Sequence, residues 1–145
     1  MAVAGTPLSE YTLRRRRVHF YETDTAGIVH FSTYFRYMEE AEHALWREVG
    51  LTIAKSRTGV GYPRVATSFE YHRPLRVEDE FDVCIKVVAK SEKTMRYQCV
   101  LTKGEETIAT GTLTIVCVST GDGQPMKAIP FPPDVAARFA VATPA

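Results

Sequence analysis

The chain has 145 residues and a mass of 16.2 kDa, the size of one ordinary domain. Hydrophobic residues make up 45% of it and charged residues 24%, which excludes a disordered tail, a fibrous repeat and a small disulfide scaffold. Because 18 lysines and arginines nearly balance 17 aspartates and glutamates, the basic excess of a nucleic-acid binder is absent. We expect one domain over residues 1–145, with residues 1–10 as a loose lead-in and no nucleic-acid partner.

Cysteine usage and hydropathy indicate the compartment. Cys84, Cys99 and Cys117 are odd in number and widely spaced, which argues against a zinc site and a disulfide framework. Reduced thiols are typical of the cytoplasm. The sequence has no secretory signal pattern, and no stretch reaches the roughly 18–20 apolar residues of a spanning helix. We therefore expect a soluble cytoplasmic protein with no membrane partner.

The first predicted element is a strand over residues 11–20, interrupted by the four arginines Arg14 to Arg17. Strand alternation would send two of them to each face, which predicts a solvated strand end; a contact for a phosphorylated ligand is the alternative. A loop is predicted over residues 21–32. A helix follows over residues 33–49, where apolar residues recur at a spacing of three to four. Ser32 or Thr33 is expected at its N-cap, and Gly50 at its C-terminal stop.

Four strands are predicted after the helix, where apolar and polar residues alternate near residues 65–73, 81–87, 95–101 and 108–118. Short polar turns between them favour an antiparallel meander. The segment 59–61 is interpreted as a turn, and Pro132 and Pro133 predict a short helix through residue 139.

This order of elements predicts an α+β fold in which a five-stranded antiparallel sheet wraps around a long central helix. A helix of about 16 residues would span roughly 24 Å along the sheet. Because such a unit leaves sheet edges and an outer face exposed, we expect an oligomer.

The loop before the helix contains the most informative motif, residues 21–31, with the sequence YETDTAGIVHF. It places Asp24 just upstream of a helix N-terminus, where unpaired N–H groups carry partial positive charge. Such groups can polarise a carbonyl while a carboxylate acts beside it. Gly27 would allow the backbone to approach a ligand closely. The alternative role for Asp24 is that of a turn or capping residue.

This segment resembles the signature loop of the hot-dog-fold acyl-CoA thioesterases, of the 4-hydroxybenzoyl-CoA thioesterase and YbgC-like kind. Three further segments resemble the family in the same order, so that the likeness covers about residues 12–140. They are YFRYMEEA at residues 34–41, YHRP at residues 71–74 followed by Glu78-Asp79, and VCV at 116–118 with MKAIP at 126–130.

The resemblance implies roles for individual residues. Asp24 matches the catalytic aspartate, which would attack the thioester carbonyl or act as base for a water. The backbone N–H of Phe31 matches the group that polarises that carbonyl. The YbgC-like branch has a Tyr-His pair where this chain has His30-Phe31, so that its histidine is shifted by one residue and His30 is a secondary candidate. Glu39 is the reserve carboxylate, because some hot-dog enzymes place theirs on this helix; near a helix N-terminus it also suits the dipole.

The resemblance also implies contacts for coenzyme A. Lys93 matches the end of a basic cluster that binds the phosphates of coenzyme A, and Lys90 and Arg96 are further candidates, each with a solvated surface role as the alternative. Glu40 and His43 form only half of a di-iron helix pattern, so no metal is expected. No cofactor is expected beyond the coenzyme A of the substrate.

The function that the sequence predicts is hydrolysis of an acyl-CoA thioester by a cytoplasmic homodimer or homotetramer, with a homotetramer favoured. One alternative is a thioesterase for acyl groups carried by acyl carrier protein. The other is a non-catalytic acyl-CoA binding module with the same fold. The acyl group, whether aromatic, short-chain or medium-chain, is left open.

Overall fold

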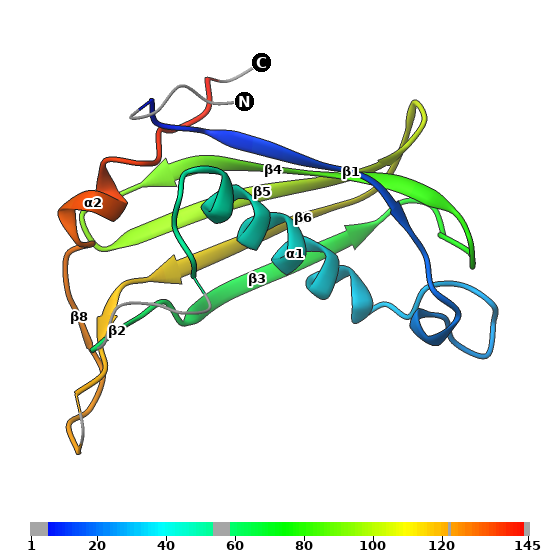
Figure 1. The fold of residues 1–145 in the computed structure, drawn as a ribbon. Helices are drawn as coiled ribbons and strands as arrows, with labels where there is room; N and C mark the ends of the chain where they lie inside the picture. Colours follow the sequence, from blue (N-terminus) through cyan, green and yellow to red (C-terminus); the bar gives the residue numbers. More distant parts are fainter. Residues whose placement is uncertain (1–5, 54–58, 122, 144–145) are drawn as a thin grey trace.

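A five-stranded antiparallel sheet forms one layer of the molecule in a computed structural model, which describes residues 6–53, 59–121 and 123–143. The strand order across the sheet is β1-β4-β5-β6-β3. The bounds of these strands are β1 Glu10–Arg17, β3 Arg64–Tyr71, β4 Glu80–Lys90, β5 Thr94–Lys103 and β6 Glu106–Val116. The sheet curves around a single long helix (Figure 1). The predicted α+β class is confirmed.

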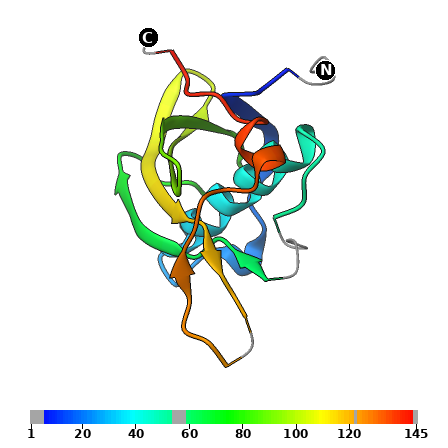
Figure 2. The same cartoon turned by 90° about the vertical axis from the view of Figure 1, so that its left-hand side faces the viewer.

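The long helix α1 spans Thr33–Glu48 and lies against the concave face of the sheet (Figures 1 and 2). Its apolar face is fully covered, with Tyr37, Ala41 and Leu45 at 0% exposure. The helix ends as predicted, because Gly50 takes a positive φ of 82° that other residues adopt only with strain. The helix thus fills the space that the sheet encloses.

The inner face of the sheet supplies the rest of the core. Alternate residues of β4 and β5 point inward and are buried, as the alternating sequence predicted. In β6 the inward position opposite Phe69 is Gly111, and a Cβ there would lie 2.7 Å from the Phe69 ring. Phe69 therefore lies over the Gly111 backbone and reaches Phe35 of α1, with ring centroids 5.1 Å apart.

The predicted meander is correct only for β4, β5 and β6. β3 pairs with β6, and β4 pairs with β1, so that consecutive strands β3 and β4 lie far apart in the sheet. The connection at residues 72–79 runs around one end of the molecule, and its Leu75 is buried in the core. This connection is long enough to carry the chain from β3 at one edge of the sheet to β4, next to β1 at the other edge. A tight hairpin would have made β3 and β4 neighbours.

The alternation predicted for the four arginines is also wrong. A β-bulge between Leu13 and Arg16, with Arg15 at a φ of 57°, breaks the register of β1. Arg16 consequently turns inward, whereas Arg14 and Arg17 stay exposed and pair with carboxylates of β4 and its preceding turn.

A second, three-stranded sheet of very short strands lies beside the main one, with the order β2-β7-β8. Its strands are β2 Val60–Gly61, β7 Val118–Ser119 and β8 Lys127–Ala128. The turn predicted at residues 59–61 therefore holds only for Gly59, and the next two residues pair with β7. The short helix α2 spans Pro133–Ala136, with proline at its start as expected but with an earlier end. Figure 2 shows this side of the molecule.

The three cysteines are free thiols, two of them buried. Among the described residues, no helix is both long and apolar enough to cross a membrane.

Candidate active site

The loop between β1 and α1 folds back on itself and presents Asp24. It begins with a turn of 3-10 helix, η1 Phe20–Glu22. Thr23 then forms a bridge with Val29, and the Asp24 N–H donates to the Ile28 carbonyl at 2.8 Å. Gly27 closes this turn with a φ of 80°, which explains why glycine stands there.

The Asp24 side chain is held in place by one of its two oxygens. Oδ1 accepts the Ala26 N–H at 2.8 Å, the geometry of an Asx turn. The described residues provide no donor to Oδ2, which is therefore available to a ligand. The turn role and a chemical role are thus compatible in one carboxylate.

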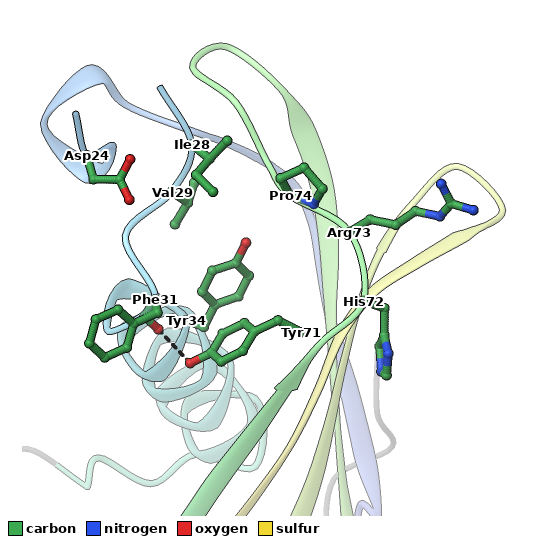
Figure 3. Close-up of a pocket in the computed structure, with 9 residues that line it drawn as sticks. All are labelled: Asp24, Ile28, Val29, Phe31, Tyr34, Tyr71, His72, Arg73 and Pro74. Carbon is green, nitrogen blue, oxygen red and sulfur yellow. Dashed lines mark hydrogen bonds between the residues drawn. The ribbon is translucent and has the colours of Figure 1, made fainter. Parts of the chain in front are cut away.

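A pocket of about 490 Å³ opens beside Asp24. Three segments line it: the loop, the start of α1 and the end of β3 with the residues after it (Figure 3). Its lining residues are Asp24, Ile28, Val29, Phe31, Tyr34, Tyr71, His72, Arg73 and Pro74. The structure therefore brings Asp24 and Phe31, two residues expected to act together, into one pocket.

The backbone N–H of Phe31 is a free donor at the helix entrance. The N–H groups on either side are used, because His30 donates to the Glu22 carbonyl at 2.9 Å and Ser32 donates to Nδ1 of His30 at 3.2 Å. No described residue accepts a hydrogen bond from the Phe31 N–H. An unpaired donor just before the first turn of α1 lies where the helix dipole is most positive.

His30 takes a local role beside the pocket. Its Nδ1 lies 2.8 Å from the Ser32 hydroxyl, and its ring stacks on Phe31 with centroids 4.5 Å apart. Because Nδ1 accepts the Ser32 N–H, the tautomer assigned from these contacts carries its proton on Nε2. Ser32 occupies the N-cap position but forms no side-chain cap bond. His30 is exposed and is not among the residues that line the pocket.

Glu39 lies away from Asp24. It lines a separate pocket of about 130 Å³ between α1 and β3, and its carboxylate is 3.6 Å from the Arg64 guanidinium. The structure therefore does not bring the two carboxylate candidates together.

The basic candidates for coenzyme A lie at the opposite end of the sheet. Arg17 pairs with Glu80 at the Asp24 end of β4, whereas Lys90 pairs with Met95 at the other end, about 30 Å away for a strand of this length. Nζ of Lys90 donates to the carbonyls of Ala136 and Phe139 at 2.6 and 2.7 Å, so that it holds the C-terminal segment. Lys93 and Arg96 are exposed near the same turn.

Two tyrosines of the pocket were not predicted from the sequence. The Tyr71 hydroxyl donates to the Phe31 carbonyl at 2.8 Å, and its ring meets Tyr34 edge-on at 5.0 Å (Figure 3). Burial raises the pKa of both hydroxyls, so each is neutral and protonated at pH 7. Tyr71 belongs to the YHRP segment, but only the sheet order shows that the end of β3 faces the start of α1.

Within the described parts of the chain, no group of three or more His, Cys, Asp and Glu side chains could hold a metal ion.

Solved structures share this topology over nearly the whole chain. A hypothetical protein from Aquifex aeolicus matches with a TM-score of 0.80 and 32% identity, over 90% of this chain and 98% of that one. A gentisyl-coenzyme A thioesterase matches with a TM-score of 0.77 and 26% identity, over 90% and 99% of the two chains. By sequence, the chain is also similar to a 1,4-dihydroxy-2-naphthoyl-CoA hydrolase of Thermosynechococcus vestitus. The two are 32% identical over 82 residues, which are 55% of this chain and 54% of that protein.

These matches identify the sheet wrapped around one helix as the hot-dog fold, and they identify this protein as a thioester hydrolase. The chain belongs to the thioesterase-like superfamily, whose family model matches residues 18–139.

Proposed function

We propose that this protein hydrolyses acyl-CoA thioesters to a carboxylic acid and free coenzyme A, with Asp24 as the reacting carboxylate. The observation that carries the proposal is the shared pocket: its lining includes both Asp24, whose Oδ2 accepts no hydrogen bond from a described residue, and Phe31, whose N–H donates to none. The similarity to a gentisyl-coenzyme A thioesterase and to a 1,4-dihydroxy-2-naphthoyl-CoA hydrolase supports a CoA thioester as the substrate.

In the proposed reaction, the Phe31 N–H donates to the thioester oxygen and stabilises the negative charge that develops there. Asp24 either attacks the carbonyl carbon, forming an anhydride that water then cleaves, or removes a proton from the attacking water. In both routes the C–S bond breaks, the thiolate of coenzyme A leaves and takes up a proton, and water supplies the second oxygen of the acid. This chemistry requires no metal or further cofactor.

The proposed working form is a homodimer or a homotetramer in the cytoplasm. β3 is the last strand of the sheet, and seven of its eight residues are exposed, all except the half-buried Phe69. Pairing of two such edges would extend the sheet and place a second subunit next to the pocket. Because Lys93 and Arg96 lie far from Asp24 within one chain, only a partner subunit would bring such residues to the phosphates of the substrate.

The test is a panel of aromatic, short-chain and medium-chain acyl thioesters, each carried on coenzyme A and on acyl carrier protein; hydrolysis is followed with a dye that traps the released thiol, and binding is measured separately. The proposal expects turnover of at least one of the coenzyme A thioesters and loss of that turnover in Asp24→Asn. Turnover only of thioesters carried on acyl carrier protein would favour the carrier-protein alternative. Binding without turnover of any thioester would favour the non-catalytic module.

A further inference from the structure

The Asp24 loop itself contains a buried carboxylate that no proposed chemical step uses. Glu22, the last residue of η1, is 8% exposed. Its Oε1 accepts the His19 N–H at 2.8 Å and the Tyr37 hydroxyl at 3.0 Å. Its Oε2 accepts Nη2 of Arg16 at 2.6 Å. The three donors come from the end of β1, the turn after it and the first half of α1.

The cluster is closed on its other side by a second acidic residue. Nε of Arg16 donates to Glu40 of α1 at 2.9 Å, and the guanidinium lies 4.9 Å from the centre of the Tyr37 ring. Burial by itself would raise the pKa of Glu22, but the hydrogen bonds from Arg16, His19 and Tyr37 outweigh it and lower that pKa. Glu22 is therefore ionised at neutral pH, and its charge is matched by Arg16.

The main chain of Glu22 connects this cluster to both groups of the proposed site. Its carbonyl accepts the His30 N–H at 2.9 Å, which fixes the peptide next to the Phe31 donor. Two residues after Glu22 comes Asp24, and between them Thr23 pairs with Val29. A shift of η1 would therefore move the carboxylate and the N–H relative to each other.

We propose that Glu22 is a positioning residue, which holds Asp24 and the Phe31 N–H at the mutual distance that thioester hydrolysis requires. The inference rests on the proposed function. Glu22 touches no reacting atom; it acts through the loop that it fastens to β1 and α1. Since a misplacement of about 1 Å can cost 10²-fold in rate, the effect of losing this anchor should appear in kcat.

The chain offers a matched control in Glu42, a buried carboxylate that lies on α1 instead of in the loop. Glu42 is 0% exposed and is paired with an arginine of a neighbouring strand, Arg64 of β3. It thus resembles Glu22 in burial and in the type of partner, but neither it nor Arg64 contacts the Asp24 loop or lines the Asp24 pocket. Any loss that comes only from a weakened core should be similar in Glu22→Gln and Glu42→Gln.

The experiment measures kcat, KM and thermal unfolding of the two variants with the best acyl-CoA substrate. Glu22→Gln keeps the oxygen that accepts from His19, Tyr37 and Nη1 of Arg16, but it loses the Oε2 acceptor for Nη2 of Arg16 and the negative charge. We expect kcat to fall at least tenfold, with KM changed less than twofold, because the acyl pocket itself keeps its walls. Glu42→Gln should keep kcat within twofold of the parent, whatever its effect on the melting temperature.

A second variant covers the case in which Glu22→Gln does not fold. Tyr37→Phe removes one hydroxyl from Oε1 and leaves the ion pair intact, and we expect it to lower kcat about threefold at constant KM. Equal kcat losses in the Glu22 and Glu42 variants, or unchanged kcat in the Glu22 and Tyr37 variants, would overturn the positioning role. Asp24→Asn distinguishes failure of this inference from failure of the proposed function. If Asp24→Asn is inactive while Glu22→Gln is fully active, only the role of Glu22 fails. If Asp24→Asn is fully active, the proposed role of Asp24 fails, and the positioning role of Glu22 fails with it.

Discussion

The Tyr71 hydroxyl donates to the Phe31 carbonyl at 2.8 Å, so that the end of β3 is tied to the entrance of α1 across 40 residues of sequence. The bond joins two of the segments that line the pocket, the end of β3 and the residues before α1 (Figure 3). Phe31 also carries the backbone N–H that donates to no described residue. Tyr71 therefore connects the strand at the sheet edge with the group that we propose to polarise the thioester.

Removal of this hydroxyl tests the connection. In Tyr71→Phe the ring still meets Tyr34, but the Phe31 carbonyl loses its donor. Because the bond is partly exposed, we expect a stability loss of about 1 kcal/mol or less. We expect kcat/KM for the best acyl-CoA to fall about three- to tenfold, since a loosened helix entrance orients its N–H less well.

The control for this variant is Thr67→Val. The Thr67 hydroxyl donates to the Thr112 carbonyl at 2.8 Å, which is a bond of the same length from the same strand. It does not line the Asp24 pocket. Equal kcat/KM for the two variants would show that Tyr71 matters only for folding.

The sequence predicted the elements that depend on local pattern. The 3–4 spacing of apolar residues gave α1 to within one residue, and the alternation in β4 and β5 gave their buried faces. The loop pattern predicted Asp24 just upstream of a helix N-terminus, and the family resemblance added the Phe31 N–H; the structure places both residues in the lining of one pocket.

The features that the sequence did not predict depend on contacts between distant segments. The β3–β6 pairing places Tyr71 opposite Phe31, and no local pattern records that pairing. The bulge in β1 turns Arg16 inward toward Glu22, whereas strand alternation alone would send two of the four arginines to each face. The position of Lys90 next to a turn predicts a surface lysine, but in the structure its ammonium donates to two carbonyls of the C-terminal segment.

Acid should weaken the connection between β3 and β4 through Asp79. Its carboxylate accepts the Arg76 N–H at 2.8 Å and Nζ of Lys103 at 3.1 Å. Burial opposes ionisation, but these two donors outweigh it and lower the pKa of Asp79 below its ordinary value of 3.8. The unfolded chain therefore binds this proton more readily, so the stabilisation is complete above pH 3.8 and is lost as the pH falls below it.

Asp79→Asn should reveal this contribution. At neutral pH the variant should be less stable by about 1 kcal/mol or less, because the site is near the surface. The gap between the two proteins in urea unfolding should close as the pH is lowered through the acid range. A gap that stays constant in acid would show that the contacts of Asp79 do not depend on its charge.

The exposed edge of β3 predicts an oligomer in solution. Light scattering at micromolar concentration should give at least twice the chain mass of 16.2 kDa, and a homotetramer is favoured. Val65, which is 58% exposed on β3, tests the edge: Val65→Lys should lower the mass, since a lysine there opposes strand pairing. Val141→Lys, at an exposed valine outside the sheet, should leave the mass unchanged. A parent protein with the mass of one chain would contradict the prediction.

Asp24→Asn separates the turn role of this residue from its proposed chemistry. The amide oxygen can still accept the Ala26 N–H, which Oδ1 now accepts at 2.8 Å, so the loop should keep its shape at a cost near the roughly 1 kcal/mol of a cap change. The negative charge and the nucleophilic oxygen are lost. Since a general base alone contributes about 10²–10⁴ in rate, we expect kcat to fall at least about 10²-fold, with little change in the melting temperature.

His30→Ala gives the comparison within the same loop. Its ring bonds Ser32 and lies outside the pocket lining, so we expect a smaller loss of kcat than in Asp24→Asn and a loss of stability from the missing contact at the helix entrance. Both variants are measured with the best thioester of the panel and by thermal unfolding. Near-normal turnover of Asp24→Asn would leave that residue with its turn role alone and would make Glu39, beside Arg64 in the second pocket, the next carboxylate to replace.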